Sequence, residues 1–485
     1  MATQPNVVLV VMDTTRADEA FDSTVAPTLA DISQEGTRVT EAISAAPWTL
    51  PSHASLLTGT HPSKHGAHAG HERLDGALPT LPEIFQDVGY ETVCVSNNTW
   101  LSIESGFDRG FDSFQQMWQL VQSTNALSEL VDVTDEHRYR AVARKLLDGN
   151  PVANTLNVLY RRFVREYSDD GAKRTTKWIN RWIAERDDNQ PFFLLVNYLE
   201  PHLEYSPPRR LATQYLPDSH TYGEAMEIPQ QPWEYLVGNV TLDDDDFEVL
   251  RGLYRAEIAY LDEQLAKLRT TLVEAGEWED TVIVIMADHG ENIGDHGLMD
   301  HQYCLYDSLI HVPLVIHGDI FSSGSDLTEP VSTVDLAPTL LDVVDIDAPQ
   351  AREEFQGRSF HPHADAPPRE FVVSEYMSPQ PSMDALERHV GELPDHIYEL
   401  DRSLRAIRTT GHKLIRGSDG TTELYDLTMD PGETADIASE NPDLLDELSG
   451  ALDEWLNTFE QADIDREISI DEARKKQLEE LGYIR

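Results

Sequence analysis

The chain has 485 residues, of which 37 are Lys or Arg and 87 are Asp or Glu, so its formal net charge at pH 7 is −50. This charge excludes nucleic acids and anionic membranes as partners over most of the surface, because both would be repelled. Only 8 of the basic residues are Lys. A carboxylate-rich, Lys-poor protein stays soluble at high salt, where charges repel each other over a distance of only about 3 Å at 1 M. The composition indicates a halophilic cytoplasm, or an acidic protein that does not depend on salt.

The sequence also bounds the compartment and the size of the fold. No stretch reaches about 18 apolar residues, and the N-terminus lacks a basic region followed by a cleavable apolar segment. Cys94 and Cys304 offer at most one disulfide and no metal-type spacing. We therefore expect a soluble, cytoplasmic protein without a membrane partner. The length allows two to four domains, or one large α/β domain with an appendage, and leaves the oligomeric state unknown.

Apolar runs alternate with helical patterns along most of the chain, which favours a parallel sheet flanked by helices. The predicted strands are at 6–12, 91–96, 192–198, 281–287 and 312–316, and the predicted helices are at 26–35, 80–88, 172–186, 243–274 and 335–343. The acidic run 243–246 is interpreted as the negatively charged start of a helix rather than as a metal site.

Two other regions differ from this pattern. Residues 120–190 are rich in helix formers and carry no site motif, so we interpret them as a helical insertion, a candidate cap for a pocket. A passage rich in Pro and Asp at 346–369 is typical of a linker. The sequence thus predicts a catalytic α/β domain at 1–345 and a smaller α+β subdomain at 370–485, with short antiparallel strands at 404–409, 413–416 and 423–427 and a helix at 441–460.

Two predicted strands stop abruptly at residues that can bind a metal. Asp13 follows the first strand, and Asp288 and His289 follow the strand at 281–287. Ligands collect at the carboxyl ends of strands in α/β sheets, so these side chains can surround one cation. The alternative is that a charged residue simply marks where each strand meets solvent.

The segment between these strands that could carry chemistry contains Thr49, Pro51 and Gly59. Pro51 can lie in the first turn of a helix that ends at Gly59, which leaves Thr49 just outside the helix N-terminus, where an anion is favoured. A Thr hydroxyl there could attack an anionic ester if a metal or a base activated it. The alternative is that Thr49 is only the N-cap of the helix.

These segments resemble the sulfatase family of the alkaline phosphatase superfamily along nearly the whole chain. The nucleophile motif of the family is Cys or Ser, any residue, Pro, Ser and Arg, followed by Thr-Gly, and it matches 49–53 and 58–59. Thr49 stands at the nucleophile position and His53 replaces the Arg. Sulfatases convert the Cys or Ser to formylglycine, so we expect no formylglycine at Thr49. Phosphodiesterase and phosphotransferase branches of the superfamily use an unmodified Thr.

The resemblance implies further roles in the expected order. Asp13 matches the first metal Asp, with Thr14 where a second Asp is often found, and Asp288-His289 match the second metal pair. His202 and His301 match residues that contact the substrate or leaving group. The Lys and His that many sulfatases carry after the second strand are replaced by a segment without either, Asn97-Asn98-Thr99. The histidines at 61, 65, 68 and 71 are expected to form a loop at the site rim.

The resemblance implies an alkaline phosphatase-like α/β/α sandwich with a mostly parallel sheet, and a hydrolase of a small anionic ester. One divalent cation, Ca, Mg, Mn or Zn, would be held by Asp13, Thr49, Asp288 and His289, with Thr49, His53, His202 and His301 as the catalytic residues. The family resemblance favours sulfate esters, whereas the unmodified Thr and the missing Lys-His pair favour a phosphodiester or a phosphonate. The alternatives are a phosphodiesterase or phospho-group transferase, and a silent binding protein.

Overall fold

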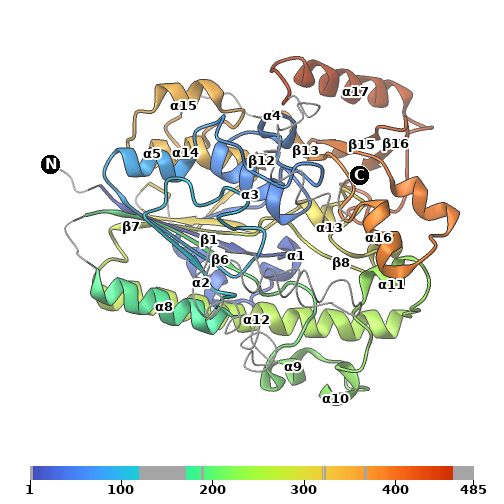
Figure 1. Cartoon of the computed structure of the whole chain (residues 1–485), viewed down its shortest axis with the longest axis horizontal. Coiled ribbons are helices and arrows are strands. Elements are labelled where there is room, and N and C mark those ends of the chain that lie inside the picture. The colour runs from blue at the N-terminus through green and yellow to red at the C-terminus, as the bar shows by residue number, and fades with distance from the viewer. Residues whose placement is uncertain are drawn as a thin grey trace, which may run out of the picture.

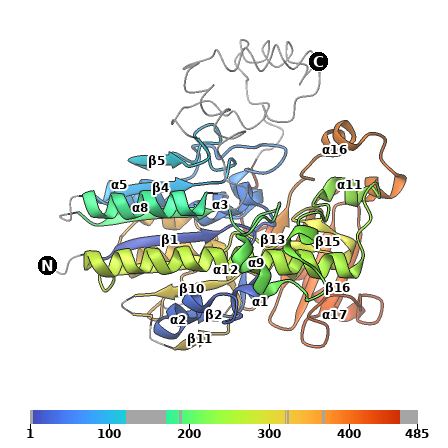
Figure 2. The ribbon, with the colours of Figure 1, turned by 90° about the horizontal axis from the view of Figure 1, so that it is seen from below.

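The computed structural model describes residues 4–119, 171–186, 190–318, 320–321, 324–364 and 369–462. An eight-stranded sheet crosses the molecule in the order β11-β2-β10-β7-β1-β6-β4-β5 (Figures 1 and 2). Strand β10 is antiparallel to both of its neighbours, and every other pair is parallel. The mostly parallel sheet is therefore confirmed. Its strands are β1 (Asn6–Met12), β2 (Thr37–Val39), β4 (Glu91–Ser96), β5 (Ser113–Gln116), β6 (Phe192–Tyr198), β7 (Thr281–Met286), β10 (Leu314–His317) and β11 (Ser325–Leu327).

Helices cover both faces of the sheet, which makes the α/β/α sandwich (Figure 1). Because successive side chains of a strand point to opposite faces, Leu9 and Val11 of β1 pack in one core and Val8 and Val10 in the other. The first core is closed by α3 (Thr49–Thr58), α5 (Leu81–Asp87) and α14 (Leu336–Val343), and the second by α2 (Pro27–Glu35), α8 (Ala172–Glu185), α9 (Arg209–Tyr215) and α12 (Asp244–Ala275).

The long helix α12 begins where the acidic run predicted. The Asp243 side chain accepts hydrogen bonds from the backbone N–H groups of Asp245 and Asp246, both at 3.0 Å. The helix ends at Gly276, whose φ of 77° is the left-handed conformation that a glycine adopts without strain. The interpretation of the acidic run as a helix start is confirmed.

The C-terminal region forms a second, antiparallel sheet in the order β13-β14-β15-β16, packed against α17 (Pro442–Leu456). Its strands are β13 (Val372–Tyr376), β14 (Leu404–Arg408), β15 (His412–Gly417) and β16 (Thr422–Asp426). Figure 2 places this sheet beside the carboxyl end of β1. One hydrophobic core contains both Leu341 of α14 and Tyr376 of β13, so the two sheets share packing. The domain boundaries at 345 and 370 stay predictions.

Of the predicted insertion at 120–190, residues 120–170 and 187–189 lie outside the described residues. Helix α8 lies between these two segments in the chain and packs on α12 in the layer beneath the sheet. No helix in the described ranges has both the length and the apolar character needed to cross a membrane. The remaining elements are α1 (Ala17–Ala20), β3 (Ala42–Ile43), α4 (Pro62–His65), α10 (Tyr222–Ala225), α11 (Pro232–Leu236), β8 (Asn292–Ile293), β9 (Met299–Asp300), α13 (Asp307–Ile310), β12 (Val331–Ser332), α15 (Pro349–Glu354), α16 (Met383–Val390) and the 3-10 helices at 295–297, 333–335 and 395–400.

Candidate active site

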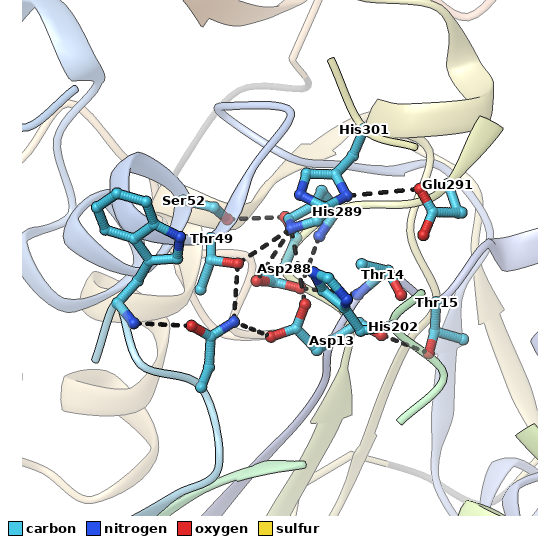
Figure 3. Close-up of polar contacts among 12 residues, drawn as sticks. Asp13, Thr14, Thr15, Thr49, Ser52, His202, Asp288, His289, Glu291 and His301 are labelled. Carbon is cyan, nitrogen blue, oxygen red and sulfur yellow. Dashed lines mark hydrogen bonds and ion pairs between the residues drawn. The ribbon is translucent and has the colours of Figure 1, made fainter. Parts of the chain in front are cut away.

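The candidate site lies at the carboxyl ends of two neighbouring strands (Figure 3). Strands β1 and β7 pair in parallel, so Asp13 and Asp288, which follow them, reach the same edge of the sheet. His289 Nε2 lies 3.5 Å from Asp288 Oδ2 and 3.8 Å from Asp13 Oδ1. All three side chains are fully buried. The three side chains that the sequence singled out therefore converge, although the two carboxylates are more than 270 residues apart in the chain.

The three side chains fit a divalent cation. Asp13 Oδ1 and Asp288 Oδ2 are buried without a hydrogen-bond partner. The separations of 3.5 and 3.8 Å are close to the edge of about 3.4 Å expected between ligand atoms that share a tetrahedral cation at about 2.1 Å. Burial, and then the other carboxylate, raises the pKa of Asp13, and burial raises that of Asp288. A cation would satisfy both carboxylates, since buried charges need a partner or a metal.

Neighbouring groups hold these ligands in place. Asp288 Oδ1 accepts hydrogen bonds from the backbone N–H groups of Thr14 at 3.3 Å and His289 at 3.0 Å. The His289 Nδ1 atom lies 3.0 Å from the Gly290 carbonyl, to which it can donate, and this leaves the Nε2 lone pair facing the carboxylates. Burial lowers the pKa of His289 to about 3, which keeps the imidazole neutral as a metal ligand must be.

Thr49 is the first residue of α3 rather than a residue just outside it, because Trp48 is the N-cap. The interpretation of Thr49 as an N-cap is therefore wrong. Its Oγ1 atom lies 3.3 Å from His289 Nε2 (Figure 3). It also accepts a hydrogen bond from Asn98 Nδ2 at 3.1 Å. The hydroxyl thus faces the candidate metal ligands instead of the N–H groups of its own helix.

Asn98 is a site residue that sequence reasoning missed. Its Nδ2 group donates at 2.6 Å to Asp13 Oδ2 and at 3.1 Å to Thr49 Oγ1, and its Oδ1 accepts from the backbone of Trp100 at 2.9 Å. The sequence offered one signal, since the segment 97–99 stands where the family carries a Lys and a His. The sequence predicts only the loss of a cationic pair, and the structure adds that the neutral amide of Asn98 donates to both Asp13 and Thr49.

His53 lies one helical turn after Thr49 and braces it. The fully buried ring has Nδ1 at 3.0 Å from the Thr49 carbonyl and at 3.4 Å from Asp288 Oδ2, while Nε2 has no partner. Ser52 of the same turn donates to the Asp288 carbonyl at 2.7 Å. These contacts tie the start of α3 to the end of β7. A direct role of His53 toward the substrate stays a prediction.

His202 and His301 stand beside the three converging side chains (Figure 3). The ring centroid of His301 lies 5.1 Å from that of His202 and 4.5 Å from that of His289. His301 Nδ1 lies 2.6 Å from Asp300 Oδ1 and 3.4 Å from Glu291 Oε1. Burial disfavours the imidazolium, but Asp300 and Glu291 outweigh it and hold the pKa of His301 well above its usual value. Both histidines thus lie beside the candidate metal ligands, and their contact with the substrate or leaving group stays a prediction.

The four other clustered histidines do not form a single loop. Residues 62–65 form helix α4. His61 is buried with its ring centroid 4.9 Å from that of Trp455, and His65 Nε2 lies 3.0 Å from Ser55 Oγ. Two of the four are therefore engaged in packing.

Comparisons with known proteins agree with this geometry. The chain matches the family model described as Sulfatase over residues 5–346, and a model described as N-sulphoglucosamine sulphohydrolase, C-terminal, over residues 294–461. It is 26% identical to a choline-sulfatase of Rhizobium meliloti, covering 90% of this chain and 83% of that protein. It is 23% identical to an N-acetylglucosamine-6-O-sulfatase of Bacteroides thetaiotaomicron, covering 96% and 89%.

Solved structures share the fold. The structure of BT4656 in complex with its substrate D-glucosamine-2-N,6-O-disulfate has a TM-score of 0.67 and 20% identity, covering 96% of this chain and all of that one. A phosphonate monoester hydrolase of Agrobacterium radiobacter has a TM-score of 0.64 and 21% identity, covering 93% and 95%. The family model spans most of the chain, from before β1 to after α14. The chain belongs to the sulfatase family and is an ester hydrolase with the alkaline phosphatase-like fold.

Proposed function

We propose that this protein hydrolyses small esters whose transferred group carries one negative charge, sulfate monoesters first, with unmodified Thr49 as the nucleophile. The observation that carries the proposal is the position of Thr49 Oγ1, between His289 Nε2 at 3.3 Å and the Asn98 amide at 3.1 Å. A buried hydroxyl at that point can attack an ester bound over Asp13, Asp288 and His289.

The proposed reaction has two balanced steps. The Thr49 hydroxyl passes its proton to a water molecule, its oxygen forms a bond to sulfur, and the bond between sulfur and the ester oxygen breaks. His202 or His301 gives a proton to the departing oxygen, so an alcohol leaves. Water then attacks the sulfur of the Thr49 ester, and the bond between sulfur and Thr49 Oγ1 breaks. One proton of the water restores the hydroxyl, and the released hydrogen sulfate loses the other to solvent as sulfate. A divalent cation held by Asp13, Thr49, Asp288 and His289 supplies Lewis acidity that lowers the pKa of the hydroxyl and balances the charge of the ester.

The charges around Thr49 support a singly charged group. Within the described residues, the side-chain contacts of Thr49, Asp13, Asp288 and His289 include no Lys or Arg. Sulfate monoesters, phosphonate monoesters and phosphodiesters carry one charge, whereas a phosphate monoester carries nearly two at pH 7. A site with a neutral amide at Asn98 favours the first three.

A second candidate is a phosphodiesterase or phosphonate monoesterase, or a transferase that passes the phosphoryl-linked group to an acceptor other than water. Thr49 itself favours this candidate. Sulfatases convert a Cys or Ser to formylglycine, and a Thr cannot be converted by the same route. The fold likeness to a phosphonate monoester hydrolase is compatible with it.

A matched set of p-nitrophenyl esters tests the substrate class. The sulfate, the phosphate, the phenylphosphonate and the bis-ester of phosphate share one leaving group, so their kcat/KM values compare the transferred group alone. We expect the sulfate to react fastest and the phosphate monoester slowest. A faster phosphonate or diester selects the second candidate, and faster phosphate monoester cleavage contradicts the charge argument. Added alcohol acceptors, with product analysis, separate a transferase from a hydrolase.

Metal dependence is tested on two ligands from different strands. Asp13→Ala and Asp288→Ala should each lose bound metal and activity together, because each removes one of the two carboxylates facing His289. Metal content is measured by elemental analysis on variants whose circular dichroism matches wild type. Full metal content in both variants would contradict the ligand assignment, and multiple turnover by wild type would exclude a silent binding protein.

We also propose that the protein works in a salt-rich cytoplasm on a small anionic ester. The net charge of −50 supports this proposal, because molar salt screens the repulsion among surface carboxylates and between the surface and an anionic substrate.

A further inference from the structure

A second group of acidic and His side chains lies beside the first and has no role in the proposed reaction apart from His301. Glu291, Asp300 and His301 each offer one ligand atom, and these atoms lie within 4.8 Å of one another. Glu291 comes from the loop that follows β7, and the other two residues come from the end of β9 and the loop after it. The group is separate from Asp13, Asp288 and His289, which form a cluster of their own.

Glu291 is the observation that points to a ligand. Its side chain is fully buried, yet neither carboxylate oxygen accepts a hydrogen bond. Glu291 Oε1 lies 3.4 Å from His301 Nδ1, which also lies 2.6 Å from Asp300 Oδ1, and neither contact has the geometry of a hydrogen bond. Without a cation the two carboxylates favour a proton on Nδ1, and a bound cation would take the place of that proton. An unpartnered buried carboxylate is costly, and proteins satisfy such a group with a hydrogen bond, an ion pair or a metal.

The spacing fits a shared cation. The 3.4 Å between Glu291 Oε1 and His301 Nδ1 equals the edge of about 3.4 Å between two ligands of a tetrahedral ion at about 2.1 Å. Asp300 Oδ1 lies 2.6 Å from His301 Nδ1, which is shorter than this edge. Binding of a shared cation would therefore separate these two atoms by about 1 Å more. Two carboxylates and one imidazole are donors that suit Mn²⁺ or Zn²⁺.

We propose that Glu291, Asp300 and His301 bind a second divalent cation, next to the one predicted at Asp13, Asp288 and His289. The ring centroids of His289 and His301 are 4.5 Å apart, so the two sites are neighbours. A cation on Nδ1 fixes the ring of His301 and leaves its Nε2 with the hydrogen, which makes Nε2 a donor. Glu291 and Asp300 thereby act as positioning residues for His301.

Metal stoichiometry of the full chain tests the second site. Protein freed of metal by chelation is loaded with MnCl₂ or, separately, ZnCl₂ in 2 M KCl, desalted in the same salt and measured by elemental analysis. High salt displaces ions held only by surface charge. Wild type should retain two equivalents of at least one of these metals. Glu291→Gln should retain one, because an amide of the same shape replaces the anionic ligand, and Asp288→Asn should also retain one.

A buried carboxylate elsewhere provides the matched control. Asp262 accepts hydrogen bonds from the backbone of Thr28 and Leu29, both at 2.9 Å, so Asp262→Asn removes a buried charge outside both clusters and should leave two equivalents. One equivalent in wild type overturns the proposal whether or not a variant folds, and so does an unchanged content in folded Glu291→Gln. If wild type binds one equivalent of metal and Asp288→Asn binds none, the second site is overturned. The proposed hydrolysis, which needs only the first site, is not contradicted by that result.

Discussion

The proposed nucleophile is a buried Thr whose hydroxyl has two polar neighbours, His289 and Asn98, at 3.3 and 3.1 Å. Thr49→Ala should retain the fold and lose about 10³-fold or more in kcat, because the attacking oxygen is gone. Thr49→Ser should keep partial activity, since it keeps the oxygen and changes only the packing of one methyl group. Rapid quenching and peptide mass analysis of wild type should find the transferred group on the peptide with Thr49. Near wild-type turnover by Thr49→Ala would mean that another group attacks.

Asn98 allows a matched pair of variants, because the neighbouring Asn97 has the same side chain but makes its hydrogen bond elsewhere. Asn98→Ala should lower kcat on the order of 10- to 100-fold, since it removes the charge-assisted hydrogen bond to Asp13 and the contact to Thr49. Asn97 Nδ2 donates instead to Thr175 at 3.0 Å, so Asn97→Ala should affect stability and leave kcat close to wild type. Steady-state kinetics compares them. Equal losses of kcat would assign Asn98 a packing role only.

At the scale of elements, a buried ion cluster joins the C-terminal sheet to helix α13. Lys413 of β15 is fully buried and contacts Asp307 at 2.8 Å and also Glu433. Arg408 of β14 reaches the same Asp307 at 2.9 Å. These contacts fix the C-terminal sheet near the loop that follows β9. They also explain why Lys, which is rare in this chain, occurs here without solvent contact.

Lys413→Met should destabilise the protein by about 3 kcal/mol, because it leaves the buried Glu433 without its cation and leaves Asp307 with Arg408 alone. Arg416→Met on the same strand removes an exposed pair with Asp453 and should cost about 1 kcal/mol or less. Denaturant unfolding at pH 7 compares the two. A similar cost for both variants would show that the buried cluster contributes no more than a surface pair.

The pH dependence of that difference follows from Asp307. Burial disfavours its charge, but Lys413 and Arg408 outweigh this and hold the pKa of Asp307 well below its usual value. A lowered carboxylate pKa stabilises the fold above the unfolded pKa, about 3.9, and this contribution is lost as the pH falls toward the folded pKa. The gap between wild type and Lys413→Met should therefore narrow below about pH 4.

At the scale of the whole molecule, the charge of −50 makes stability depend on salt. The melting temperature should rise from 0.1 to 2 M KCl as repulsion among carboxylates is screened. The measurement is made with a chelator present, so that salt effects on metal binding do not contribute. Equal melting temperatures at both salt concentrations would contradict the halophilic interpretation.

The sequence by itself determined the elements that hydrophobic period and local signals dictate. The predicted strands at 6–12, 91–96 and 192–198 have the bounds observed, because fully buried strands are continuous apolar runs. The same logic located Asp13, Asp288 and His289, since a parallel sheet brings its strand ends to one edge. Thr49 was identified from the nucleophile motif, because a motif of consecutive residues can be recognised in the sequence without the structure.

Only the tertiary structure decided how side chains without such a signal meet. Asn98 reaches Asp13 across 85 residues and Thr49 across 49, and nothing in the order of an Asn-Asn-Thr segment tells which amide turns toward the sheet edge. Glu291 and His301 are ten residues apart in the chain, and their 3.4 Å approach depends on how the loop between β7 and β9 folds back. Period and motif fix where strands end, whereas loop packing fixes which polar atoms remain without partners, and it is those atoms that mark the two proposed cation sites.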